Sequence, residues 1–174
     1  LITDTLQEFQ AETAIPKNER INILAAFIEY IVFKKMSDNY RQDDRHRVCA
    51  YDLLVFIHDK IVNGKRIDVG VIIDCKERKA CQIFECKSFP SDISDIKDKI
   101  VFLERIRKEF DAVRAGGEEC EIYLLTLHSP DAMRQFNITQ EFYPTVLLLS
   151  RQGIIERIFK RPPLCNCKTK SEMY

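Results

Sequence analysis

The chain has 174 residues, of which 45% are hydrophobic and 31% charged, so its composition is globular and its length is that of one domain. Its 27 basic and 27 acidic residues give a formal net charge of zero, which argues against coating nucleic acid or membrane by bulk charge but leaves local basic patches open. The most apolar stretch, residues 21–33, contains Asn22 and Glu29, so no membrane span is expected. Seven scattered cysteines, an odd number, and no signal-peptide pattern predict a cytoplasmic protein rather than a secreted disulfide scaffold.

The first part of the chain predicts one long helix followed by strands. Apolar residues three and four apart, from Ile21 to Val32, predict an amphipathic helix over residues 17–35, after weak helical periodicity at 1–15. The polar stretch 36–47 is expected to be a loop. Residues 48–57 are predicted to be a strand, although a helix also fits so short an apolar run, and Asn63-Gly64 predicts the turn into the next strand.

The middle of the chain predicts a hairpin and a second long helix. Residues 66–73 and 80–89 are strand-like and are separated by the charged connector 74–79, which predicts an antiparallel hairpin. An even apolar stripe then predicts a helix over residues 94–115, ended by Gly116-Gly117. The charged residues of this helix alternate in sign, and we expect its basic residues to lie on a solvated face: Lys97, Lys99, Arg105, Arg107 and Lys108.

The last part of the chain predicts a crossover. Residues 121–127 should form a strand, and 131–142 a helix capped by Ser129 or Asp131. Two further strands, 143–150 and 154–159, are expected around a turn at 151–153. Because a strand–helix–strand succession requires a crossover, we expect an α/β fold with a mixed sheet and helices on both faces. Residues 1–160 are predicted to be one domain and 161–174 an irregular tail.

Two acidic side chains in the predicted hairpin suggest chemistry. In a strand the side chains alternate, so Glu85 and Lys87 point to one face and Phe84 and Cys86 to the other. Asp68, in the partner strand, is expected opposite Glu85. Two facing carboxylates are unfavourable unless a cation lies between them or one is protonated. Mg²⁺ is commonly held by one or two carboxylates, so the pattern predicts a divalent metal site with an ammonium beside it.

The segment Arg66-Ile67-Asp68-Val69-Gly70, a short connector, and Ile83-Phe84-Glu85-Cys86-Lys87 resemble the PD-(D/E)xK nuclease superfamily. In that superfamily an Asp on one strand and an acid-x-Lys on the next form the metal site. The resemblance implies a restriction-endonuclease-like core, αβββαβ, with a central mixed sheet of four to five strands flanked by helices. The predicted order of elements over residues 17–127 matches this core.

The resemblance also implies roles for individual residues. Asp68 and Glu85 would be metal ligands, the backbone carbonyl of Cys86 would complete the coordination, and Lys87 would be the catalytic lysine. Members commonly add a glutamate from the first helix; Glu19 and Glu29 are the candidates, and Glu19 is preferred. Two departures are that Ile67 stands where the motif has proline, and that the second long helix has no glutamine at its start.

These residues predict an enzyme that hydrolyses phosphodiester bonds with Mg²⁺ or Mn²⁺, with DNA as the expected substrate. The resemblance implies a role in restriction, repair, recombination or mobile-element defence. With zero net charge, affinity would come from a local patch, a homodimer or a fused recognition domain. One alternative is a catalytically inactive relative that keeps the fold for nucleic-acid binding or assembly, and another is a hydrolase that acts on RNA or a small molecule. The remaining cysteines are interpreted as small core residues.

Overall fold

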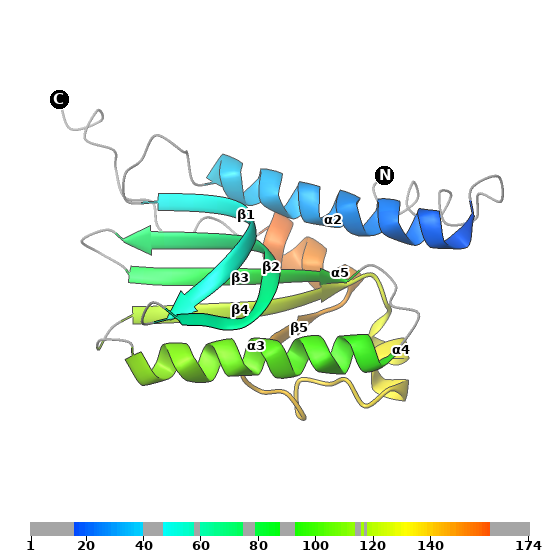
Figure 1. Ribbon diagram of the computed structural model, residues 1–174. Helices are drawn as coiled ribbons and strands as arrows, with labels where there is room; N and C mark the ends of the chain where they lie inside the picture. The colour runs from blue at the N-terminus through cyan, green and yellow to red at the C-terminus, as the bar shows by residue number, and fades with distance from the viewer. Residues whose placement is uncertain are drawn as a thin grey trace.

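A computed structural model of the chain describes residues 16–39, 47–57, 60–74, 79–87, 93–113, 116 and 118–160. The predicted helical periodicity at 1–15 and the predicted tail 161–174 lie outside these residues. The described elements follow in chain order (Figure 1): α2 (Lys17–Asn39), β1 (Arg47–Ile57), β2 (Lys60–Asp74), β3 (Lys79–Lys87), α3 (Ile93–Val113), β4 (Glu118–Thr126), α4 (Pro130–Gln135), β5 (Leu147–Leu149), α5 (Arg151–Ile154) and the π-helical turn η1 (Ile155–Phe159).

The strands form one mixed sheet in the order β1-β2-β3-β4-β5. β1, β2 and β3 pair antiparallel, whereas β3, β4 and β5 pair parallel. The helix α2 covers one face of the sheet and α3 the other (Figure 1). The predicted α/β class, the mixed sheet, the helices on both faces and the antiparallel hairpin are therefore confirmed.

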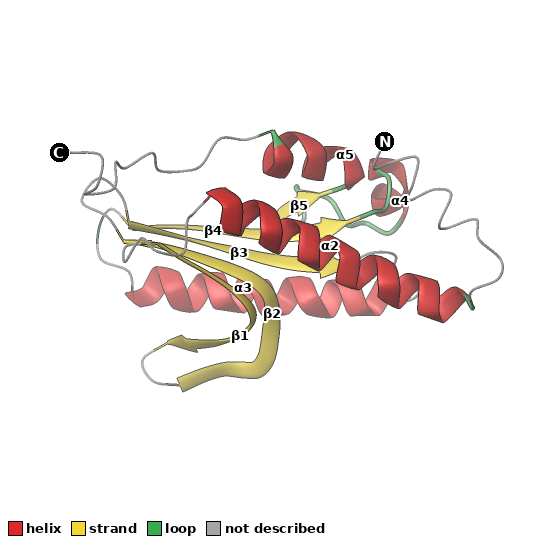
Figure 2. Ribbon diagram, turned by 90° about the horizontal axis from the view of Figure 1, so that it is seen from above, coloured by secondary structure: helices red, strands yellow, loops and turns green. Residues whose placement is uncertain are grey.

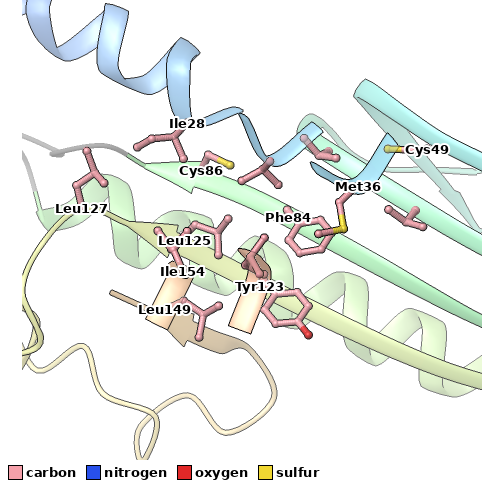
Figure 3. Close-up of a cluster of buried hydrophobic side chains, with 14 of the residues drawn as sticks. Ile28, Met36, Cys49, Phe84, Cys86, Tyr123, Leu125, Leu127, Leu149 and Ile154 are labelled. Carbon is pink, nitrogen blue, oxygen red and sulfur yellow. The ribbon is translucent and has the colours of Figure 1, made fainter. Parts of the chain in front are cut away.

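Two apolar clusters, one on each face, hold the helices to the sheet. The first joins Ile28, Val32 and Met36 of α2 to the β-strand residues Phe84 and Leu125 (Figure 3). Phe84 and Tyr123 stack in this cluster with ring centroids 4.9 Å apart. The second joins Ile96, Ile100 and Ile106 of α3 to residues of the opposite face, including Ile83 and Leu124. Because Met36 is buried, α2 continues into the predicted loop and ends at Asn39.

The Asn63-Gly64 pair is not the turn between the first two strands. Ile57 of β1 already pairs with Lys60 of β2, so the two strands are paired before Asn63 is reached. The pairing then jumps from Phe56↔Ile61 to Leu54↔Arg66, which leaves Asn63-Gly64 inside the irregular part of β2. The two strands bend sharply away from the rest of the sheet (Figure 2). The turn-forming pair therefore marks a strand irregularity instead of a hairpin turn.

Three predictions for the last part of the chain differ from the structure. The helix expected over 131–142 is only the short α4, which Ser129 caps by accepting a hydrogen bond from the Ala132 N–H; Asn137, with φ of 57°, follows it. The segment 151–159 is helical rather than a turn and a strand. Its residues Ile154 and Ile158 are buried four apart, and both join the apolar cluster under α2. Of the predicted strand 143–150, only β5 is present.

None of the described helices combines the length and the apolar character needed to cross a lipid bilayer.

Candidate metal centre

The strands β2 and β3 separate at the predicted site. Their antiparallel pairing runs from Asp74↔Lys79 to Val69↔Phe84, and one step further the same register places Asp68 opposite Glu85. Beyond this point β2 continues beside β1, and β3 continues beside β4 as far as Lys87. Figure 2 shows β1 and β2 curving away from β3. We call the point of separation the fork of the sheet; Asp68, Glu85 and Lys87 all lie at it.

The bend that opens the fork is visible in β1 and β2. Asp52 of β1 adopts a left-handed backbone, with φ of 53°, between the pairs Tyr51↔Val69 and Leu53↔Ile67. Arg66 binds this residue through contacts from its Nη1 atom to Asp52 Oδ2 at 2.6 Å and to the Asp52 carbonyl at 3.1 Å. Aspartate tolerates the left-handed region better than most residues, and the ion pair holds it there.

Asp68 is fixed to the opposite strand by its own side chain. Its Oδ2 accepts a hydrogen bond of 2.6 Å from the Cys86 backbone N–H. This bond spans the fork where the backbone pairing between the two strands has ended. Burial raises the pKa of Asp68, and the Cys86 hydrogen bond and the charges of Lys87 and Lys99 oppose that rise. The remaining oxygen, Oδ1, is an acceptor that this bond does not use.

Glu85 is the most deeply buried charged group at the fork, with a side chain that is 0% exposed. Its Oε1 lies 2.5 Å from Lys99 Nζ and 3.5 Å from Lys87 Nζ. Its Oε2 is buried and accepts no hydrogen bond from the described part of the chain. Burial, and then the negative charge of Asp68, raise the pKa of Glu85, against the effect of the two lysines. A buried carboxylate with a free oxygen is an available ligand for a cation.

The glutamate that α2 brings toward Asp68 is Glu29 and not Glu19. Burial and the charge of Asp68 raise the Glu29 pKa, and Tyr51 donates a hydrogen bond of 2.8 Å to Glu29 Oε2. Glu19 is exposed, and it precedes Glu29 by ten residues, or about 15 Å along the helix axis. The buried stripe of Leu24, Ile28 and Val32 sets the rotation of α2, which places Glu29 at the edge of the packed face. Of the two candidate glutamates, Glu29 is therefore the one that lies near Asp68, and it replaces Glu19 in the candidate site.

Lys99, for which the sequence predicts a position on a solvated face, belongs to the site. Its side chain, 21% exposed, reaches from α3 to Glu85 on β3. The signal was present in the helical spacing, because Lys99 lies three residues from both Ile96 and Phe102, and these two residues are buried. A lysine inside the apolar stripe of a helix needs a buried partner, and Glu85 is that partner.

The donor set at the fork suits a hard cation that keeps some of its water. Across the described ranges, no three His, Cys, Asp or Glu side chains come close enough together to enclose a metal ion by themselves. Asp68 and Glu85 are nevertheless adjacent carboxylates. The Cys86 hydrogen bond leaves Asp68 Oδ1 unused, Glu85 Oε2 accepts no hydrogen bond from the described residues, and the Cys86 carbonyl lies between Glu85 and Lys87 in the chain. Mg²⁺ is usually held by one or two carboxylates, water and substrate phosphate, so these residues fit it.

Comparison of the chain with models of known protein families finds no matching family, and comparison with curated proteins finds no matching sequence. The interpretation of the fork therefore stands on the geometry and the chemistry of its residues.

The raised pKa values of Asp68 and Glu85 predict a pH dependence of stability in metal-free buffer. Their ordinary values are 3.8 and 4.5, so the native state holds their protons more tightly than the unfolded state does. This tighter proton binding stabilises the native state fully below about pH 4, and the stabilisation is lost as the pH rises through the native-state pKa values. Each unit by which a pKa is raised corresponds to about 1.4 kcal/mol of unfolding free energy.

The variant Asp68→Asn keeps an acceptor for the Cys86 N–H but cannot ionise. We expect its unfolding free energy, relative to the wild type, to increase as the pH rises above about 4 in urea titrations with EDTA. The control is Asp74→Asn, an exposed carboxylate at the end of β2 away from the fork, measured in the same titrations. A constant difference for both variants would contradict the burial argument.

Proposed function

We propose that this protein is a Mg²⁺- or Mn²⁺-dependent nuclease that hydrolyses phosphodiester bonds in DNA, with a restriction-endonuclease-like fold of the PD-(D/E)xK superfamily. The observation that carries the proposal is the meeting of Asp68, Glu85 and Lys87 where β2 and β3 separate. The mixed sheet between α2 and α3, with β4 parallel to β3, supports the same conclusion because it is compatible with the αβββαβ order.

In this proposal Asp68, Glu85 and the Cys86 carbonyl hold the metal ion. A bound Mg²⁺ or Mn²⁺ would stabilise negative charge on the phosphoryl oxygens and acidify the attacking water. The hydrogen bond from the Cys86 N–H orients the Asp68 carboxylate, and the packing of Phe84 and Cys86 against α2 fixes the strand that carries Glu85. The protein thus supplies two anchored carboxylates at the boundary of its apolar core.

Lys87 is suited to act on the reacting groups. Its side chain is 31% exposed, whereas the neighbouring Glu85 is fully buried, so its ammonium group can contact water or a phosphodiester. A lysine is a compact positive charge that can orient a water molecule or neutralise charge that develops on the phosphate. The Glu85 contact at 3.5 Å restrains the ammonium beside the metal ligands.

Glu29 and Tyr51 form the opposite boundary of the proposed site. Their hydrogen bond joins α2 to β1 and holds the Glu29 carboxylate close enough to Asp68 for the two charges to repel. A glutamate in this position can accept a hydrogen bond from a water molecule held by the metal ion. DNA is the proposed substrate, bound in the cytoplasm through a local basic patch, a second copy of the chain or a fused recognition domain.

The central test is metal-dependent cleavage by variants of the two lysines that end β3. Lys87→Met should lower the cleavage rate at least about 100-fold in Mg²⁺ or Mn²⁺, because it removes the charge beside the reacting phosphate. Lys79→Met removes the lysine at the far end of the same strand and should leave the rate unchanged. The assay compares duplex DNA, single-stranded DNA, a branched junction and RNA, with circular dichroism as the control for folding.

Two results would contradict the proposal. Equal rates for Lys87→Met and the wild type would exclude Lys87 from the reaction. Nucleic-acid binding without cleavage of any substrate, in either metal, would favour the inactive binding module instead.

The position of Glu29 predicts a difference between two glutamates of α2. Glu29→Gln should reduce cleavage about 10-fold or more and weaken Mn²⁺ binding, because it removes a negative charge beside Asp68. Glu19→Gln should change neither quantity. Rate measurements and Mn²⁺ titration calorimetry check both variants, and a larger effect at Glu19 would show that the wrong part of the helix has been assigned to the site.

A further inference from the structure

We propose that Lys99 is the resident counter-charge of Glu85 in the metal-free protein and that it opposes the entry of a divalent ion. This inference rests on the proposed metal site. It assigns Lys99 a positioning role, which acts through Glu85, and leaves the contact with substrate to Lys87.

The contacts of the two lysines with Glu85 differ. Lys99 Nζ is 2.5 Å from Oε1, and Lys87 Nζ is 3.5 Å from the same atom. Lys99 is also the less exposed of the two, at 21% against 31%. At short range and in a partly buried place the attraction between charges is strong, so Lys99 contributes most of the compensation that the buried carboxylate needs.

Ammonium groups offset part of the negative charge at the fork before any metal binds. Glu29 adds a carboxylate beside Asp68. The two proposed metal ligands, Asp68 and Glu85, face the positive charges of Lys87 and Lys99. A divalent ion that binds both carboxylates must approach an ammonium group that already contacts one of them. Repulsion between these cations lowers the affinity for the metal.

Lys99 has other contacts that it can keep when the metal binds. Its ammonium group lies 3.5 Å from the carbonyl oxygen of Arg66 and 5.7 Å from the centre of the Phe102 ring. The flexible stem of a lysine allows the ammonium to move toward these groups while its base stays packed on α3. The structure therefore offers a second position for this charge.

The test compares Lys99→Met with Lys97→Met, an exposed lysine two residues earlier on α3. Lys99→Met should bind Mn²⁺ about 10-fold more tightly than the wild type in titration calorimetry. Its melting temperature should fall in EDTA, because Glu85 loses its partner, and should rise with Mn²⁺ by more than that of the wild type. Lys97→Met should match the wild type in both measurements.

A double variant keeps the test decisive if Lys99→Met does not fold. Lys99→Met with Glu85→Gln removes both charges, so it should fold in EDTA and bind Mn²⁺ more weakly than the wild type. Failure of the double variant to fold would show that Lys99 acts through packing, not through its charge, and would overturn the inference.

If the wild type binds Mn²⁺ and Lys99→Met binds it no more tightly, the inference fails and the proposed function stands. If neither binds Mn²⁺, both fail.

An independent contact, away from the fork, carries a second inference. Cys81 of β3 and Cys120 of β4 are paired in register on neighbouring parallel strands, and their Sγ atoms are 2.8 Å apart. Both are free thiols. We infer that a peroxide oxidises this pair to a reversible disulfide. Neighbouring strands are about 4.8 Å apart, within the range of Cα separations that disulfides span.

The local chemistry favours Cys81 as the first thiol to react. The contact with Cys120 lowers the pKa of Cys81, against the effect of burial, and the charge of Arg107 lowers it further. Arg107 is held in place by a hydrogen bond of 2.6 Å to the Cys120 carbonyl. Cys81 is partly exposed, whereas Cys120 is buried beside it, an arrangement of attacking and resolving cysteines.

The reaction balances with peroxide as the oxidant. The Cys81 thiolate attacks one peroxide oxygen, the O–O bond breaks, and a sulfenic acid forms with release of one water molecule after protonation. The Cys120 sulfur then attacks the Cys81 sulfur, which forms the S–S bond and releases the second water molecule. Two thiols lose two electrons and two protons in total, and the peroxide takes them up.

Peptide mapping of the intact chain tests this second inference. After treatment with hydrogen peroxide and alkylation, non-reducing digestion should yield a peptide pair linked through Cys81 and Cys120, which dithiothreitol separates. Cys49→Ser, a substitution of another buried cysteine, should leave the link intact, whereas Cys120→Ser should leave Cys81 as a sulfenic acid that dimedone traps. Peroxide-treated wild type without this link would overturn the inference.

Discussion

The buried carboxylate of Glu85 is the constraint on which the arrangement of the site depends. A charge with no exposure to water requires a cation, and the chain provides Lys99 at 2.5 Å and Lys87 at 3.5 Å. Asp68, the next carboxylate across the fork, adds a like charge that makes this requirement stronger. The fork is therefore a place where positive charge is strongly favoured, whether an ammonium group or a metal ion supplies it. This property links the proposed metal binding to the proposed role of Lys99.

The fold provides this site by letting two paired strands separate. As far as Val69 and Phe84 the hairpin is an ordinary antiparallel ladder, and beyond them the Asp68 side chain takes over the contact with β3. Both strands stay hydrogen-bonded beyond the fork, because β2 continues beside β1 and β3 continues beside β4. Each face is covered by one long helix, and each helix adds a charged residue to the site, Glu29 from α2 and Lys99 from α3. The site thus lies between two helices that each pack against the sheet through a buried apolar cluster.

The parts of this arrangement that depend on local pattern could be predicted from the sequence, and the parts that depend on packing could not. The predicted hairpin placed Asp68 opposite Glu85; the pairing of β2 with β3 ends one step earlier, at Val69↔Phe84, and its register, if continued, would bring the two residues opposite each other. The choice between Glu19 and Glu29 depended on which part of α2 lies over the site. Tertiary packing sets that position, and the local sequence pattern does not predict it. The helix at 151–159 was not predicted because a short apolar run fits both the spacing of a strand and that of a helix. The packing of Ile154 and Ile158 under α2 favours the helix. Lys99 was not predicted because a charged residue on a helix is usually exposed, although its spacing from the buried residues Ile96 and Phe102 places it on the buried side.

A crystal of the protein soaked in Mn²⁺ would test the central claim most directly, because anomalous scattering locates the ion without reference to activity. We expect a single strong peak between the carboxylates of Asp68 and Glu85, within coordination distance of the Cys86 carbonyl, with Lys99 moved toward the Arg66 carbonyl. A crystal that shows no peak at the fork, with the Lys99 ammonium still on Glu85 at saturating Mn²⁺, would contradict it.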